Sequence, residues 1–155
     1  IIPGLKPNYS NTGETELFTK GNQIWGFYQA RKEIARQDKV YLVEGQFDVI
    51  SCYDNGLHNV VAFSGTALTE QQRKTLYRMT HNVTLMFDGD EAGQHATLKH
   101  TKELLNMGFN VRCILLPEGK DPDEFTHSSQ EEVPIWVKSH ERSFVEYMQD
   151  HAGGR

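Results

Sequence analysis

The sequence predicts an α/β domain with a roughly four-stranded parallel sheet flanked by helices, preceded by a helical lead-in and followed by a C-terminal helix. Short apolar segments alternate with amphipathic ones along the 155 residues, which is about one domain's length. The chain is 37% hydrophobic and has neither repeats nor low-complexity tracts, so it can build one core. The expected strands are 39–43, 59–63, 83–87 and 111–116. The expected helices are 23–36, 47–53, 69–80, 91–106 and 131–149.

Start and stop signals support the expected helices. Thr69 and Gln72 have the spacing of a capping box, in which each side chain bonds the other residue's backbone amide. Gly56 and Gly108 follow two other amphipathic segments, where a helix commonly ends. The short strands between helices indicate βαβ units, whose parallel sheets are covered on both faces.

We expect three parts along the chain. Residues 1–38 hold an irregular segment and an amphipathic helix, residues 39–127 hold the alternating core, and residues 128–155 form a C-terminal helical segment. The first part is rich in Pro, Gly, Asn and Ser before its helix begins, which is typical of irregular backbone.

Charge and composition restrict the function classes. The 16 Lys and Arg against 21 Asp and Glu give a net charge of −5, which argues against simple electrostatic binding of nucleic acid. The sequence has no apolar run of the roughly 20 residues needed to span a bilayer, so we expect a cytoplasmic protein without a membrane partner. Cys52 and Cys113 are isolated in apolar stretches and indicate neither a disulfide framework nor a zinc site.

Pairs of acidic residues follow three of the expected strands. These residues are Glu44, Asp48, Asp88, Asp90, Asp121 and Asp123. In an open α/β sheet, ligands bind beyond the carboxyl ends of the strands, so neighbouring strands would bring these acids together. Each acid taken alone could equally be a helix cap or a solvated loop residue. Together they would repel one another unless cations intervened or some of the acids were protonated. Oxygen ligands of this kind suit Mg²⁺ or Mn²⁺.

Glycines accompany the acids. Gly45 and Gly89 are next to them, and Gly93 falls in the first turn of the following helix. Since glycine has no Cβ, a phosphate or a metal ion could approach the backbone closely at these positions.

Four sequence blocks resemble the Toprim domain, most closely that of DnaG-type bacterial primases. The blocks are 42–50 (LVEGQFDVI), 64–69 (SGTALT), 87–93 (FDGDEAG) and 120–123 (KDPD). Topoisomerases, which share the domain, have Asp-Pro-Asp-Arg-Glu-Gly at the third block, so the Asp88-Gly-Asp90 sequence favours a primase. By the same resemblance, residues 1–38 would be the end of the upstream primase subdomain.

The resemblance implies synthesis of short RNA primers on single-stranded DNA by nucleotidyl transfer during replication. Its substrates would be ribonucleoside triphosphates, and two or three Mg²⁺ or Mn²⁺ ions would assist. It also implies a replicative helicase as partner, bound through a C-terminal domain that is not in this chain. We expect the isolated fragment to be weakly active or inactive.

The resemblance also implies roles for individual residues. Glu44, Asp88 and Asp90 would be catalytic and hold the ion nearest the chemistry, with Glu44 alternatively a general acid or base. Asp48, Asp121 and Asp123 would hold the ions that bind the triphosphate. The expected nucleotide- or template-binding residues are Lys20, Gly45, Gly89, Gly93 and Lys120.

Two other functions fit the same residues. A Toprim nuclease would use these acids to activate water against a phosphodiester. A non-catalytic nucleotide-binding module would instead rely on basic residues around the first helix, which are Arg31, Lys32, Arg36 and Lys39. DNA cleavage without nucleotide favours the former, and metal-independent binding favours the latter.

Overall fold

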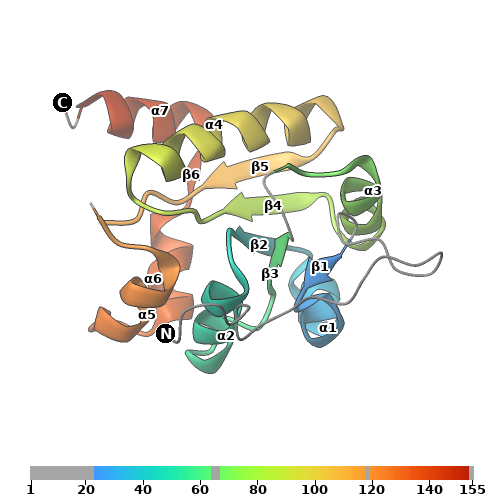
Figure 1. The fold of residues 1–155 in the computed structure, drawn as a ribbon, viewed down its shortest axis with the longest axis horizontal. Coiled ribbons are helices and arrows are strands. Elements are labelled where there is room, and N and C mark those ends of the chain that lie inside the picture. The colour runs from blue at the N-terminus through green and yellow to red at the C-terminus, as the bar shows by residue number, and fades with distance from the viewer. Residues whose placement is uncertain (1–22, 64–66, 118, 154–155) are drawn as a thin grey trace, which may run out of the picture.

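The computed structural model describes residues 23–63, 67–117 and 119–153. Its strands are β1 (Ile24–Trp25), β2 (Val40–Val43), β3 (Val60–Phe63), β4 (Asn82–Leu85), β5 (Asn110–Cys113) and β6 (Arg142–Ser143). Within these ranges they form one six-stranded sheet in the order β1-β3-β2-β4-β5-β6 (Figure 1). The four central strands are parallel, and β1 and β6 pair antiparallel at the two edges. The α/β class and the four-stranded parallel core are therefore confirmed.

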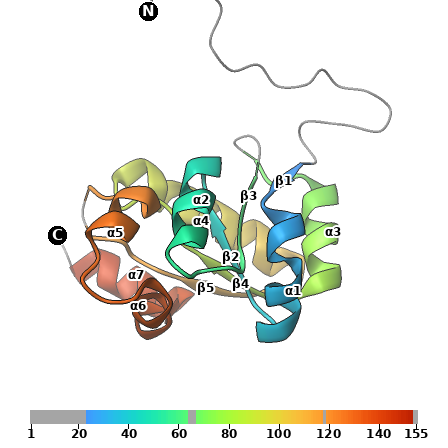
Figure 2. The ribbon, with the colours of Figure 1, turned by 90° about the horizontal axis from the view of Figure 1, so that it is seen from below.

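Helices cover both faces of the sheet. They are α1 (Phe27–Gln37), α2 (Gln46–Asp54), α3 (Glu70–Met79), α4 (Glu91–Asn106), α5 (Pro122–Ser128), α6 (Val133–His140) and α7 (Phe144–Gly153). Buried side chains from α1, α3, α4 and α7 form one apolar cluster with the strands, and those from α2, α5 and α6 form the other. The central strands are thus enclosed on both sides, which explains their almost unbroken apolar sequence. Figure 2 shows α2 and α5 next to each other on the second face.

The two edge strands are the main addition to the expected fold. β1 occupies the beginning of the expected helix 23–36, so that helix starts at Phe27 instead. Gly26 makes the turn between them with φ of 77°, and a Cβ there would lie 2.8 Å from the Val49 side chain. Glycine alone adopts such a conformation readily, so this position sets the boundary between strand and helix.

The prediction of one helix over 131–149 is wrong. The structure has α6 and α7 there, with β6 between them. Glu141 is extended after α6, and its side chain, 6% exposed, is paired with Lys39 at 2.7 Å. The Glu141 carboxylate also accepts a hydrogen bond from the Tyr41 hydroxyl. The contacts of Glu141 with Lys39 and Tyr41 interrupt the expected helix. The helical spacing of apolar residues nevertheless continues across this break.

Helix α5 was not expected, although Asp121 and Glu124 form a capping box around Pro122 at its start. Cys52 and Cys113 are buried and free. Among the described residues, no helix is long and apolar enough to cross a membrane.

Candidate acidic metal site

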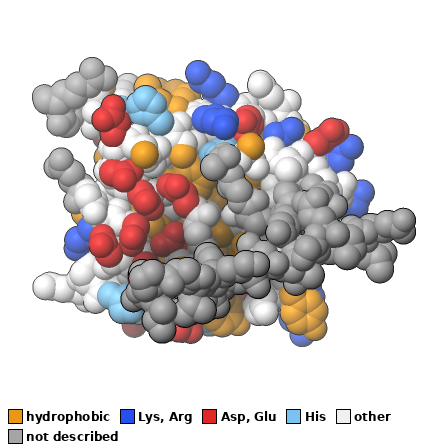
Figure 3. Space-filling model, in the orientation of Figure 1, with side chains coloured by type: hydrophobic (Ala, Val, Ile, Leu, Met, Phe, Trp, Pro, Cys, Tyr) orange, Lys and Arg blue, Asp and Glu red, His pale blue; other side chains and the backbone are white. Residues whose placement is uncertain are grey.

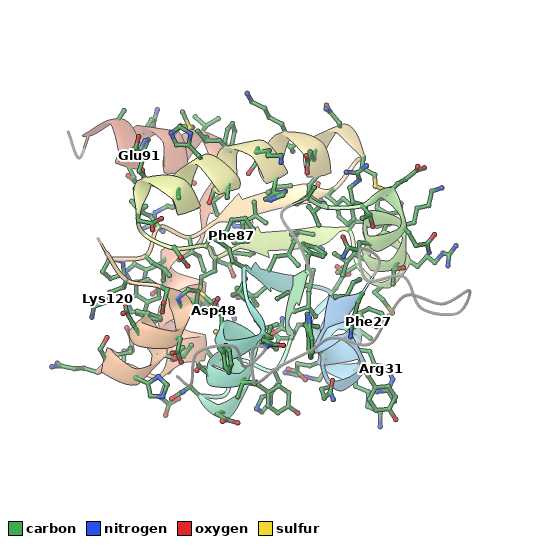
Figure 4. The ribbon with its side chains drawn as sticks, in the orientation of Figure 1. Phe27, Arg31, Asp48, Phe87, Glu91 and Lys120 are labelled. Carbon is green, nitrogen blue, oxygen red and sulfur yellow. The ribbon has the colours of Figure 1, made fainter. Side chains whose placement is uncertain are left out.

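The carboxyl ends of three neighbouring strands carry the acidic segments. Glu44 directly follows β2, Asp88 lies in the loop after β4, and Asp121 precedes α5 on the segment that leaves β5. β4 lies between β2 and β5 in the sheet, so the three segments are brought together. Figure 3 shows acidic side chains gathered at the edge to which β4 and β5 point. Figure 4 places Asp48 and Lys120 on this same side of the sheet.

Hydrogen bonds join the acidic segments directly. The Asp88 amide donates to Glu44 Oε1 at 3.2 Å, which links the loops after β2 and β4. Asp48 Oδ2 accepts from the Gly45 amide at 3.0 Å, and its Oδ1 accepts from the Asp123 amide at 3.3 Å. Asp48 therefore bridges the start of α2 and the start of α5.

Asp90 and Asp121 are helix caps. Asp90 Oδ1 accepts from the Gly93 amide at 2.7 Å at the start of α4, and Asp121 Oδ1 accepts from the Glu124 amide at 2.7 Å at the start of α5. The alternative that an acid after a strand is a helix cap is thus correct for Asp90 and Asp121. It does not exclude a second role, because an ionised carboxylate has about four acceptor positions and a cap uses only one.

Burial and mutual repulsion perturb two of the acids. Burial and, after it, the charges of Glu44, Asp48, Asp121 and Asp90 together raise the pKa of Asp88 to about 7. Burial likewise raises the pKa of Asp48 to about 6, against the lowering effect of its hydrogen bonds from the Gly45 and Asp123 amides. The other carboxylates therefore lie close enough to Asp48 and Asp88 for their charges to oppose the ionisation of these two residues.

Ser51 is a site residue that sequence reasoning missed. Its hydroxyl donates a hydrogen bond to Asp123 Oδ1 from the buried face of α2. His127 Nδ1 lies 3.4 Å from the same oxygen, on the exposed side of α5. The only signal in the sequence is that Ser51 is three positions after Asp48 and so shares its helix face.

Gly89 and Gly93 pack tightly against backbone. A Cβ on Gly93 would lie 2.1 Å from the Asp88 carbonyl oxygen, and one on Gly89 would lie 2.5 Å from the Pro117 carbonyl oxygen. The Gly89 amide also donates to the Lys120 carbonyl at 2.8 Å, which joins the second and third acidic segments. These glycines are needed for the loops to approach one another, whatever ligand they also admit.

Of the two lysines expected to bind nucleotide or template, the structure describes only Lys120. Lys120 Nζ donates at 2.7 Å to the hydroxyl of Ser128, the last residue of α5. Lys20 lies outside the described residues, as do positions 64–66 of the second Toprim block.

The donor chemistry of the site fits a divalent cation. In the part of the chain that the structure describes, no three His, Cys, Asp or Glu side chains are arranged to hold a metal ion. Several carboxylate oxygens instead accept backbone amides, as shown above for Asp48, Asp90 and Asp121. However, all the converging donors are hard oxygens, and the pKa of Asp88 is raised by burial and then by a repulsion that a cation would remove.

The fold and this convergence of acids define a Toprim-like domain. The model of the Toprim-like family matches residues 41–126, which is more than half of the chain. The chain belongs to that family.

Its relatives are DNA primases. The chain is 42% identical over 145 residues to a DNA primase of Staphylococcus aureus, a match that covers 93% of this chain and 24% of the relative. Among solved structures, a primase of Aquifex aeolicus comprising zinc-binding and RNA polymerase domains has a TM-score of 0.85 and 34% identity, covering all of this chain and 38% of the other. A DnaG primase catalytic domain bound to single-stranded DNA has a TM-score of 0.79 and 30% identity, with 96% and 48% covered. The chain thus spans about a quarter of the curated primases it matches.

Proposed function

We propose that this chain is the catalytic Toprim part of a DNA primase. It synthesises short RNA primers on a single-stranded DNA template from ribonucleoside triphosphates, with Mg²⁺ or Mn²⁺ as cofactor. The observation that carries the proposal is the convergence of acids from β2, β4 and α5, in a chain that is 42% identical to a primase over 93% of its length. The similarity to a DnaG catalytic domain bound to single-stranded DNA supports the proposal that single-stranded DNA is the template.

The proposed site divides its acids between two tasks. Glu44, Asp88 and Asp90 hold the ion nearest the reacting atoms, and Asp48, Asp121 and Asp123 hold the one or two further ions that bind the triphosphate. Such ions, when bound, lower the pKa of an attacking hydroxyl and neutralise charge on the triphosphate and the leaving pyrophosphate.

The chain's own residues prepare this chemistry. The hydrogen bond from the Asp88 amide to Glu44 fixes the loop after β4 relative to the end of β2. The cap made by Asp90 leaves its second carboxylate oxygen free of the Gly93 amide. Glu44 is exposed, which supports the alternative that it acts as a general acid or base on the primer hydroxyl instead of holding the ion.

We assign phosphate binding to the basic and glycine residues around the acids. Lys120 precedes α5 and is proposed to contact the triphosphate, and Lys20 is proposed to contact nucleotide or template. Gly45, Gly89 and Gly93 keep side-chain bulk away from the same edge.

The remaining assignments concern the whole protein. The match to residues 41–126 supports a Toprim core at 39–127, with 1–38 from an upstream subdomain and 128–155 as a helical extension. We also propose the RNA primer as product, a replicative helicase as partner and the cytoplasm as the location.

Primer synthesis by the natural full-length protein tests the function. With Mg²⁺, ribonucleoside triphosphates and single-stranded DNA, the wild type should make short RNA, and Asp88→Ala should abolish it. Glu131→Ala, a change at an exposed acid outside the site, should leave the yield unchanged. Near-normal yield from Asp88→Ala would overturn the assignment. Cleavage of single-stranded DNA with Mn²⁺ and no nucleotide would instead favour a Toprim nuclease.

A further inference from the structure

We propose that Ser51 is a positioning residue for the acidic site. Its hydroxyl fixes the Asp123 carboxylate and thereby sets the start of α5 against α2. The consequence for metal binding rests on the proposed function, but the positioning itself does not.

Two side chains on one face of α2 hold Asp123. Asp48 Oδ1 accepts the Asp123 amide at 3.3 Å, and the Ser51 hydroxyl donates to Asp123 Oδ1. Asp48 and Ser51 are three positions apart, so they face α5 from successive turns of α2. Helix α2 therefore fixes both the backbone and the carboxylate of this one residue.

The Ser51 hydroxyl is protected from water, whereas His127, the other side chain that approaches Asp123 Oδ1, is exposed. Ser51 is 8% exposed, whereas the His127 side chain, which approaches the same Asp123 oxygen at 3.4 Å, is 69% exposed. A buried hydroxyl that donates to a carboxylate is stronger and better oriented than a solvated contact. Ser51 therefore determines which Asp123 oxygen faces α2 and leaves Oδ2 for other partners.

The contact matters because α5 is short, and its cap and first turn hold two of the six acids, Asp121 and Asp123. Its seven residues begin at Pro122, directly after the Asp121 cap. Farther along, Phe125 packs against Trp136 with ring centroids 4.2 Å apart, which anchors the middle of the helix to α6. The first turn is thus held by Asp48 and Ser51, and loss of the hydroxyl would let Asp121 and Asp123 shift relative to Asp48.

Substitution of Ser51 by Ala tests the proposal in the metal-free 155-residue chain. Alanine favours helix, so the variant should fold. Exchange of the backbone amides of 123–128 should become about tenfold faster, as expected when a hydrogen bond to an ionised group is lost. Exchange elsewhere, including α4, should not change. Ser51→Thr keeps a hydroxyl and should restore slow exchange.

Mn²⁺ binding, followed by electron paramagnetic resonance, tests the effect on the site. Ser51→Ala should weaken the affinity about five- to tenfold, since both acids of α5 lose their fixed position. Ser51→Thr should recover most of it. Ser139→Ala is the matched control, because the exposed Ser139 hydroxyl bonds only within and beside α6.

The outcomes separate the inference from the proposed function. Unchanged exchange over 123–128 in Ser51→Ala overturns the positioning role. Faster exchange throughout the chain also overturns it, because it would indicate a general packing role. Wild-type protein that binds no Mn²⁺ overturns the proposed metal site, while the exchange measurement still decides the role of Ser51.

Discussion

The Glu44 carboxylate accepts a hydrogen bond from the backbone amide of Asp88, with 3.2 Å between Oε1 and N. The two residues are 44 positions apart and follow the adjacent strands β2 and β4. The bond provides the Asp88 amide with an acceptor, but it also holds the carboxylates of Glu44 and Asp88 near each other. Burial and this neighbour are the two largest causes that raise the pKa of Asp88 to about 7. The site is therefore arranged at an electrostatic cost that a cation would offset.

The stability of the metal-free chain should fall as the pH rises from about 4 to about 8. The pKa of Asp88 is raised from its ordinary 3.8 to about 7 on folding, so the folded state binds more protons between these values. Bound protons are lost from the folded state as the pH rises through 7, and stability falls with them. Because Asp88 is only half-buried, we expect a loss of about 1–2 kcal/mol, or a Tm lower by about 3–6 °C.

Thermal unfolding of the wild type and Asp88→Asn, in a chelator and at several pH values, measures this loss. Asp88→Asn should lose the part of this pH dependence that lies above about pH 6, while Asp48, with its pKa raised to about 6, keeps a part below it. The variant should be the more stable protein at pH 8 without metal. Addition of Mg²⁺ at pH 8 should raise the Tm of the wild type more than that of the variant. Parallel pH profiles of the two proteins would contradict the account of the Asp88 environment.

Asp90→Asn should separate the two roles of this residue. Asparagine caps helices as well as aspartate does, so the bond to the Gly93 amide, 2.7 Å in the wild type, should survive and the Tm should change little. Primer synthesis should nevertheless be lost, because the charge needed for the ion is removed. Asp90→Ala should lose both activity and about 1 kcal/mol of stability. The matched pair Asp121→Asn and Asp121→Ala tests the same separation at α5. Full activity of Asp90→Asn would restrict Asp90 to capping.

Gly93→Ala should destabilise the chain by about 2 kcal/mol or more, as expected for overpacking against rigid backbone. The added Cβ would lie 2.1 Å from the Asp88 carbonyl oxygen, so either α4 or the Asp88 loop must move. Gly153→Ala is the control, because a Cβ there meets nothing within 4 Å. Chemical denaturation measures both variants. A Gly93→Ala variant as stable as Gly153→Ala would show that the loop adjusts freely.

Glu141→Ala should cost about 3 kcal/mol, because it removes one partner of a buried ion pair. Glu141 is paired with Lys39 at 2.7 Å and with Arg112 at 3.5 Å. Glu141→Gln keeps an acceptor for the Tyr41 hydroxyl and should lose less. Glu131→Ala, at an exposed position, should change stability by less than about 0.5 kcal/mol. Similar midpoints of urea unfolding for Glu141→Ala and Glu131→Ala would contradict the prediction that the Glu141 ion pair stabilises the fold.

Sequence patterns predicted those strands, helices and caps that depend on residues close together in the chain. The expected strands and helices of the core were found because burial and capping leave a mark within a few residues, as at Thr69 and Gln72. The break at Glu141 was missed because the residues around it keep helical apolar spacing. Its cause lies in Lys39 and Tyr41, roughly a hundred positions away. The contact between Ser51 and Asp123 was missed for the same reason.

The sequence by itself determined that acidic residues follow buried strands, and that these acids include Glu44, Asp88 and Asp121. Only the tertiary structure decided that β4 lies between β2 and β5, so that the three acidic segments meet at one edge. The order of strands in a sheet depends on how the crossover helices pack on its two faces, which is not encoded in the order of segments along the chain. The excess of negative charge is therefore concentrated at one place, where burial and mutual repulsion perturb Asp48 and Asp88 together.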